Sequence, residues 1–149
     1  MTTYITEDKI KTLEKKAREI RETTIRSLVA SGENGTGGHT AGPLGMADIF
    51  TVFYFHVLNH RPDEPDWADR DRLILSHGHI TPVRYAAMAH AGYFPVEECL
   101  TLRKLGSRLQ GHPERTKLPG VETTSGPLGS GLSQAAGIAY GARMDKKRF

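Results

Sequence analysis

One short apolar segment most constrains what this chain can fold into. Residues 72–76, Arg-Leu-Ile-Leu-Ser, run into His77-Gly-His79, which is the pattern of a buried β-strand. A parallel sheet needs further strands beside the first, each connected by a helix. The 149 residues therefore predict part of an α/β fold, in which helices flank a parallel sheet that this chain leaves incomplete.

Most of the remaining sequence has the pattern of helices. Apolar periodicity and helix-boundary residues predict five of them, at residues 6–31, 46–58, 81–92, 95–106 and 130–147. Thr6 is the expected N-cap of the first helix, and Gly32 its expected end. Thr81 is the expected N-cap of the third, followed by Pro82 in the first turn. Residues 46–58 are apolar on almost every side, which predicts a buried helix.

The last predicted helix carries small residues at close intervals. They are Gly131, Ala135, Gly137, Ala139 and Gly141. Each glycine inside a helix costs about 1 kcal/mol relative to alanine. The pattern therefore indicates that another helix or a cofactor packs closely against this face.

Two glycine-rich loops are candidate ligand sites. Residues 32–45 contain six glycines in fourteen positions, so the backbone there can approach a ligand closely. Residues 126–131, Gly-Pro-Leu-Gly-Ser-Gly, lead into a helix whose N-terminus would attract phosphate oxygens. The second loop matches neither a Walker loop nor the G-x-G-x-x-G pattern. From these residues alone, a tight connection remains an alternative to a phosphate site.

Three of the seven histidines lie beside glycine in turn-like sequence: His39, His79 and His112. A loop histidine can reach a ligand, and its ordinary pKa near 6.5 suits it to proton transfer. A surface role remains the alternative for any one of them. The recurrence of the pattern favours a functional site.

The other titratable residues indicate less. His56 and His60 are one helical turn apart, but no glutamate follows His56 as in the zincin motif, which disfavours zinc. Cys99 follows Glu97 and Glu98, whose charges would raise its pKa and disfavour a nucleophilic role.

Composition narrows the class of protein. A formal charge of +3 from 20 basic and 17 acidic residues disfavours a nucleic-acid partner. No apolar run reaches the roughly 18 residues of a membrane span, and no signal peptide is visible at the N-terminus. A single cysteine fits a reducing compartment. We expect a cytoplasmic protein without membrane partners.

Four segments together resemble the transketolase family. They are Gly-His-Thr-Ala-Gly-Pro-Leu-Gly-Met at 38–46, the run from Asp66 through His79, Leu-Gly-Ser-Arg-Leu-Gln-Gly-His-Pro-Glu at 105–114, and Pro-Gly-Val-Glu-Thr-Thr-Ser-Gly-Pro-Leu-Gly-Ser-Gly at 119–131. They follow the family's order and spacing. The resemblance implies that residues 1–149 are part of the N-terminal, thiamine diphosphate-binding domain.

The resemblance also implies a chemistry. Such enzymes move a two-carbon ketol unit from a ketose phosphate to an aldose phosphate in the pentose phosphate pathway and the Calvin cycle. His39 and His112 would be the catalytic residues and would contact the substrate. The implied cofactor-binding residues are His79, Gly126, Pro127 and Leu128.

Two features depart from the family pattern. Thr40 stands where proline is common, which bears on the choice of sugar substrates. The family's Gly-Asp-Gly metal motif is absent, so Mg²⁺ or Ca²⁺ would have its ligands outside this chain. We therefore expect a split or truncated transketolase that is inactive alone.

Several alternatives remain open. The chain could work as a homodimer or with a C-terminal transketolase subunit. The small residues near Gly137 and the apolar segment 46–58 could then serve a subunit interface or the core of one chain. A 1-deoxyxylulose-phosphate synthase-like enzyme would keep the fold and change the substrates. A non-catalytic binding module would keep the loops without the reaction.

Overall fold

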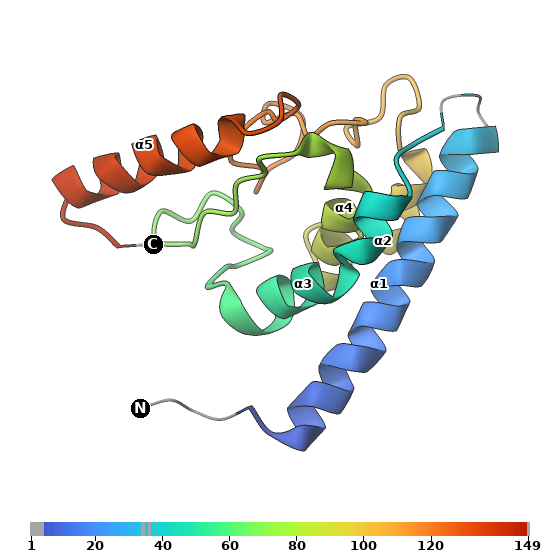
Figure 1. The fold of residues 1–149 in the computed structure, drawn as a ribbon, viewed down its shortest axis with the longest axis horizontal. Helices are drawn as coiled ribbons and strands as arrows, with labels where there is room; N and C mark the ends of the chain where they lie inside the picture. The colour runs from blue at the N-terminus through green and yellow to red at the C-terminus, as the bar shows by residue number, and fades with distance from the viewer. Residues whose placement is uncertain (1–4, 34, 36, 149) are drawn as a thin grey trace.

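A computed structural model describes residues 5–33, 35 and 37–148, and it places helices around a central helix, α4 (Figure 1). The α-helices are α1 (Glu7–Glu33), α2 (Ala41–Gly45), α3 (Ala47–Val52), α4 (Thr81–Ala91) and α5 (Ser130–Met144). A π-helix, η1 (Phe53–Val57), and two 3₁₀-helices, η2 (Gly78–Ile80) and η3 (Val96–Thr101), complete the set. Figure 1 shows α5 extending away from the group formed by α1 to α4.

The predicted strand is not observed: none of the residues that the structure describes lies in a β-strand. A strand is defined by a ladder of backbone hydrogen bonds to a neighbour, and residues 72–76 have no such neighbour in the described part of the chain. Two of their carbonyls accept hydrogen bonds from a loop instead. The Leu75 oxygen accepts a hydrogen bond from the Ser125 hydroxyl at 2.8 Å, and the Ser76 oxygen accepts one from the Gly129 amide at 2.9 Å.

The first predicted helix is confirmed, with small changes at its ends. Thr6 caps it as expected, because its Oγ1 accepts a hydrogen bond from the Lys9 amide at 3.3 Å. The helix continues one residue beyond Gly32, to Glu33. Its buried stripe includes Leu13 and Ile20, which lie at the spacing expected of an amphipathic helix.

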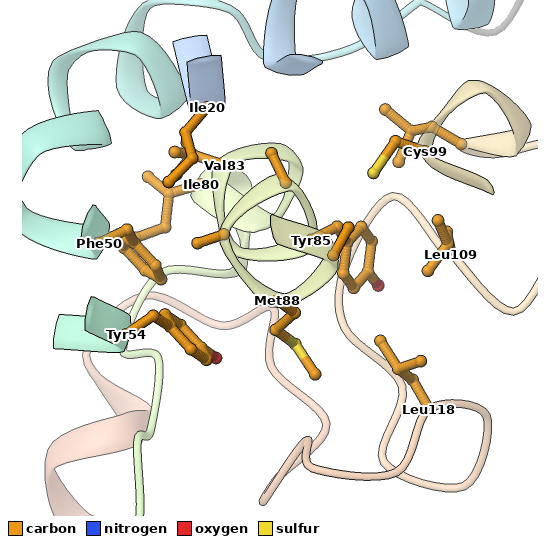
Figure 2. Close-up of a cluster of buried hydrophobic side chains, with 14 of the residues drawn as sticks. Ile20, Phe50, Tyr54, Ile80, Val83, Tyr85, Met88, Cys99, Leu109 and Leu118 are labelled. Carbon is orange, nitrogen blue, oxygen red and sulfur yellow. The ribbon is translucent and has the colours of Figure 1, made fainter. Parts of the chain in front are cut away.

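The core forms around α4, whose residues from Thr81 to Ala89 are all buried. Ile20, Phe50, Tyr54, Ile80 and Leu118 are among the side chains gathered around this helix (Figure 2). The core thus draws on segments from both halves of the chain. Burial of such side chains from water is the main favourable term in folding.

The boundaries of α4 differ slightly from the prediction. Ile80 occupies the N-cap position and Thr81 begins the helix. The Thr81 hydroxyl donates to the Gly78 carbonyl rather than capping an amide. The end is as expected, because Gly92 has φ +100° and terminates the helix in the left-handed region.

Two predicted helices differ from the structure, the first in burial and the second in extent. Residues 46–58 form α3 and then the π-helix η1, and this segment is buried on one side only, since Ile49 and Val57 are 45% and 55% exposed. The helix expected at 95–106 is only the 3₁₀-helix η3. Beyond it, Arg103 and Gly106 have φ +60° and +82°, and left-handed residues do not continue a right-handed helix.

The last helix packs closely at one end only. A Cβ at Gly131 would lie 2.6 Å from the Leu75 oxygen, so the expected close approach occurs there. At Gly137 and Gly141 a Cβ would meet nothing within 4 Å. Close packing around Gly137 is therefore absent within the described chain, and the helix ends at Met144 rather than at residue 147.

A buried ion pair fastens the segment before residues 72–76 to the long loop before α5. The Arg70 guanidinium lies 2.9 Å from the Glu122 carboxylate, and both side chains are 11% exposed. Burial raises the pKa of Glu122, while Arg70, Arg84 and Arg115 oppose that shift. The loop that leads into α5 is thus held against the body of the molecule.

No helix within the described ranges combines the length and the apolar character that crossing a bilayer requires.

Candidate active site

The structure brings His39, His79 and His112 together from three separate segments. His39 lies just before α2, His79 lies in η2 at the start of α4, and His112 lies in the loop that leads toward α5. The ring centroids are 4.6 Å apart for His39 and His79, and 5.0 Å apart for His79 and His112. Those of His39 and His112 are 6.0 Å apart. We call these three side chains the histidine cluster.

Gly78 allows the cluster to form. A Cβ at this position would lie 2.6 Å from Cδ2 of His112 and 3.0 Å from the carbonyl oxygen of Ser125. The absence of a side chain lets the His112 ring and the Ser125 backbone lie directly against the turn before His79. The glycine of His77-Gly-His79 therefore has a packing role.

Hydrogen bonds hold the His112 loop beside the Gly126 loop. The Ser125 amide donates to the Pro113 oxygen at 3.2 Å. The Glu114 carboxylate accepts hydrogen bonds from the hydroxyls of Thr116 and Thr124 at 3.0 and 3.1 Å. Hydrogen bonds from the Thr116 amide and hydroxyl, and then from Thr124, lower the pKa of Glu114. These contacts place His112 where a Cβ on Gly126 would be 3.9 Å from its ring.

The surroundings of His112 favour its neutral form. Partial burial lowers its pKa most, and the neighbouring His79, His39 and Arg103 lower it further. Near neutral pH the imidazole is therefore uncharged and one of its ring nitrogens can accept a proton.

His79 has an unsatisfied nitrogen. Its Nδ1 atom is buried and has no hydrogen-bond partner within the described ranges. A buried polar group left unpaired costs about 1–3 kcal/mol. Such an atom in the middle of the cluster is evidence for a ligand that supplies the missing partner.

The 126–131 loop offers fewer backbone amides to an anion than its sequence suggests. The Gly129 amide already donates to the Ser76 oxygen at 2.9 Å, and the Ser130 amide donates to the Pro127 oxygen at 3.4 Å. Pro127 has no amide hydrogen to offer. The predicted contacts of Gly126, Pro127 and Leu128 with a cofactor therefore concern the earlier part of the loop, where Pro127 and Leu128 are exposed.

An open cleft of about 480 Å³ borders His112. Its lining residues are Arg103, Gln110, Gly111, His112, Pro113, Glu114 and Thr124. Sequence reasoning missed Arg103 at this cleft, because nothing in Leu-Arg-Lys distinguishes it from a surface arginine. It also missed the packing roles of Gly78 and Ser125. The position of Gly78 between two histidines was the one sequence feature that indicated a close contact there.

The remaining candidates lie outside the cluster. His60 Nε2 is 2.8 Å from the Tyr54 carbonyl oxygen and its Nδ1 is 3.1 Å from the Tyr93 hydroxyl, so both nitrogens are engaged. The π-helix containing His56 ends at Val57, before His60. Burial first, and then Glu98, raise the pKa of the Cys99 thiol to about 12. In the described residues, no three His, Cys, Asp or Glu side chains are arranged to hold a metal ion.

Comparison with known proteins identifies the family. Residues 17–149 match the family described as transketolase, thiamine diphosphate binding domain. Transketolase of Buchnera aphidicola is 47% identical over 118 residues, which are 78% of this chain and 18% of that protein. Transketolase 2 of Escherichia coli K12 is 46% identical over 118 residues, with the same coverage.

Solved structures agree with the sequence match. Transketolase from Leishmania mexicana has a TM-score of 0.72 and 41% identity, covering 85% of this chain and 18% of its own. Transketolase from Pichia stipitis in complex with sedoheptulose-7-phosphate has a TM-score of 0.77 and 36% identity, with the same coverage. The fold is thus that of a thiamine diphosphate-binding domain. The chain belongs to the transketolase family, and it spans about a fifth of the length of these relatives.

Proposed function

We propose that this chain is the N-terminal part, or a separate subunit, of a transketolase. The enzyme would use thiamine diphosphate to transfer a two-carbon ketol unit from a ketose phosphate to an aldose phosphate, in pentose phosphate or Calvin-type metabolism. The observation that carries the proposal is the convergence of His39, His79 and His112 beside Gly126. The Pichia stipitis relative, solved with sedoheptulose-7-phosphate, supports a sugar phosphate substrate.

The residues present fit the cofactor. The buried Nδ1 of His79, which has no hydrogen-bond partner in the described part of the chain, would hydrogen-bond the diphosphate. The backbone of Gly126, Pro127 and Leu128 would lie against the cofactor, in a loop that leads into the N-terminus of α5. When bound, thiamine diphosphate supplies the carbanion chemistry, and the protein supplies binding and orientation.

His39 and His112 would act on the substrate. The neutral His112 can accept a hydrogen bond from a reacting hydroxyl and take up its proton at a ring nitrogen. His39, whose ring centroid is 4.6 Å from that of His79, would contact the substrate from the segment just before α2. Both histidines are exposed, as residues that must meet a substrate should be.

The rest of the enzyme would come from elsewhere. Mg²⁺ or Ca²⁺ would bind through ligands outside this chain, and the partner would be a second copy or a C-terminal transketolase subunit. The exposed side chains of Leu132, Tyr140 and Met144 on α5 offer apolar surface to such a partner. The lone cysteine, Cys99, fits a cytoplasmic location.

Calorimetric titration with thiamine diphosphate and Mg²⁺ tests the proposal, both for the chain alone and with a C-terminal transketolase fragment. We expect measurable binding with the fragment present, and binding weakened about tenfold or more by His79→Ala, because a charge-assisted hydrogen bond contributes about 1.5–3 kcal/mol. The exposed His56 supplies the control, since His56→Ala should leave the affinity unchanged. Absence of binding in every combination would favour a non-catalytic module.

Assays of ketol transfer separate the remaining alternatives. The chain alone should be inactive, and activity of the purified 149-residue chain without a partner would disprove that expectation. Reconstituted activity should follow the ketose and aldose phosphate pair supplied. Turnover of pyruvate with an aldose phosphate would instead favour the 1-deoxyxylulose-phosphate synthase-like enzyme.

A further inference from the structure

Arg103 has an unusual backbone conformation at the edge of the histidine cluster. Its φ of +60° lies in the left-handed region, which is unfavourable for a residue other than glycine because the Cβ crowds the following carbonyl oxygen. Its amide donates to the Leu109 oxygen at 2.9 Å and so closes the turn between residues 103 and 109. A strained residue persists only where its surroundings hold it, and such residues gather at functional sites.

The side chain of Arg103 joins two loops that carry histidines. Its Nη1 donates to the Gly37 carbonyl oxygen at 3.2 Å, two residues before His39. The rest of the side chain lies along Gly111, where a Cβ would be 3.1 Å from Nε and 3.2 Å from Cδ. Gly111 directly precedes His112. Arg103 therefore contacts the backbone next to both exposed histidines of the cluster.

The Gly37 backbone, which accepts this hydrogen bond, is itself held by α1. It also accepts a hydrogen bond from the Ser31 hydroxyl at 2.5 Å, and the Gly37 amide donates to the Ser31 oxygen at 3.2 Å. Ser31 belongs to α1, a helix of 27 residues packed on the core. The guanidinium is thus fastened to the body of the molecule as well as to the loop before His39.

We propose that Arg103 is a positioning residue of the histidine cluster: by joining Gly37 to the backbone at Gly111, it sets the separation of the His39 and His112 imidazoles. A guanidinium suits this role because its planar fork can hold a carbonyl while its aliphatic part packs on a glycine. Only an effect of Arg103 on catalysis rests on the proposed function; its effect on the positions of the two imidazoles does not.

The position of Arg103 also affects the charge state of His112. Arg103 adds its positive charge to the effects of His79 and His39 in lowering the pKa of His112. Glu114 is the other charged residue of the cleft, and its carboxylate accepts hydrogen bonds from the Thr116 and Thr124 hydroxyls. Removing the guanidinium should therefore move the two exposed histidines relative to each other and ease protonation of His112.

Imidazole NMR titrations of the 149-residue chain without cofactor test the proposal. Arg103→Asn is the main variant, because asparagine tolerates a positive φ and removes the guanidinium. We expect the His112 titration midpoint to move upward and the ring chemical shifts of His39 to change. Lys104→Asn is the matched control: it removes a neighbouring exposed positive charge and should change neither.

Two further variants separate geometry from charge. Arg103→Lys keeps the charge and removes the planar fork, so the His112 midpoint should stay near that of the unmodified chain while the His39 shifts change. Gly111→Ala should displace the guanidinium and change the His39 ring chemical shifts as Arg103→Asn does. Gly45→Ala, where a Cβ would meet nothing within 4 Å, is its control.

Unchanged His39 shifts and an unchanged His112 midpoint in folded Arg103→Asn would overturn the proposal, as would equal changes in Lys104→Asn. If circular dichroism shows that Arg103→Asn does not fold, Arg103→Lys and Gly111→Ala decide the question by the same readouts. All these readouts are taken without thiamine diphosphate. A failure of the proposed function would therefore leave the result on Arg103 intact.

Discussion

The Cβ position of Gly78 lies 2.6 Å from the His112 ring and 3.1 Å from the Ser125 carbonyl carbon. Gly78→Ala should therefore push apart the loops that carry His79 and His112, and destabilise the chain by about 1–3 kcal/mol, as overpacking does. Urea unfolding measures the loss of stability, and imidazole NMR measures the displacement of His112.

The control for this substitution is Gly45→Ala, since a Cβ at Gly45 would meet nothing within 4 Å. It should leave the His112 signals in place. Equal stability and identical His112 shifts in Gly78→Ala and the unmodified chain would show that the turn has more room than the structure indicates.

Single residues also show how far the candidate site was predictable. His39, His79 and His112 could be chosen from sequence because each lies beside a glycine in a turn. Arg103 could not, because its contacts with Gly37 and Gly111 join positions far apart in the chain. A residue whose role depends on distant partners leaves no local pattern.

At the scale of elements, α5 offers a matched pair of glycines. Gly131→Ala places a Cβ 2.6 Å from backbone atoms of Leu75 and Ser76, which cannot move aside as a flexible side chain could. We expect a loss of about 1–3 kcal/mol in the free energy of unfolding. Gly137→Ala meets nothing within 4 Å and should gain up to about 1 kcal/mol from helix propensity.

Chemical denaturation of the two variants measures this difference. Equal effects of both substitutions would mean that α5 does not pack on residues 75 and 76 as described. If Gly137→Ala folds normally but weakens assembly with a partner chain, the small residues of α5 serve an interface between chains.

The elements were predictable to different degrees for a physical reason. The helix at residues 6–31 was correct because its apolar stripe and its N-cap Thr6 are local properties. The strand predicted at 72–76 is not observed, because a strand exists only with a partner and the described residues provide none. The helix expected at 46–58 was right in type but not in burial, which depends on what packs against it.

At the scale of the whole molecule, α1 and α4 meet at a histidine, His90, whose protonation depends on the fold. His90 Nε2 lies 2.9 Å from the Thr23 hydroxyl, and Nδ1 lies 4.0 Å from the Glu19 carboxylate. Burial and then Lys16 lower the pKa of His90, while Glu19 opposes them. The folded chain therefore binds a proton on His90 at lower pH than the unfolded chain does.

This difference makes stability depend on pH. Because the unfolded state binds the proton first, the contribution of neutral His90 is present above pH of about 6.5 and is lost as the pH falls toward the lowered pKa. We expect urea unfolding to give a smaller free energy at pH 5.5 than at pH 7.5. His90→Gln should reduce that difference, and His56→Gln, at an exposed site, should not. Equal differences in both variants would contradict the assignment to His90.

The sequence by itself determined the family, the main helices and the three glycine-flanked histidines, because motifs, periodicity and turn residues are written within short stretches. Only the tertiary structure decided that His39, His79 and His112 share one cluster, with centroids 4.6 to 6.0 Å apart. It also decided which glycines contact neighbours and that Arg103 joins two loops. These features depend on how distant segments pack around α4, and a close contact between distant residues is a property of the whole fold.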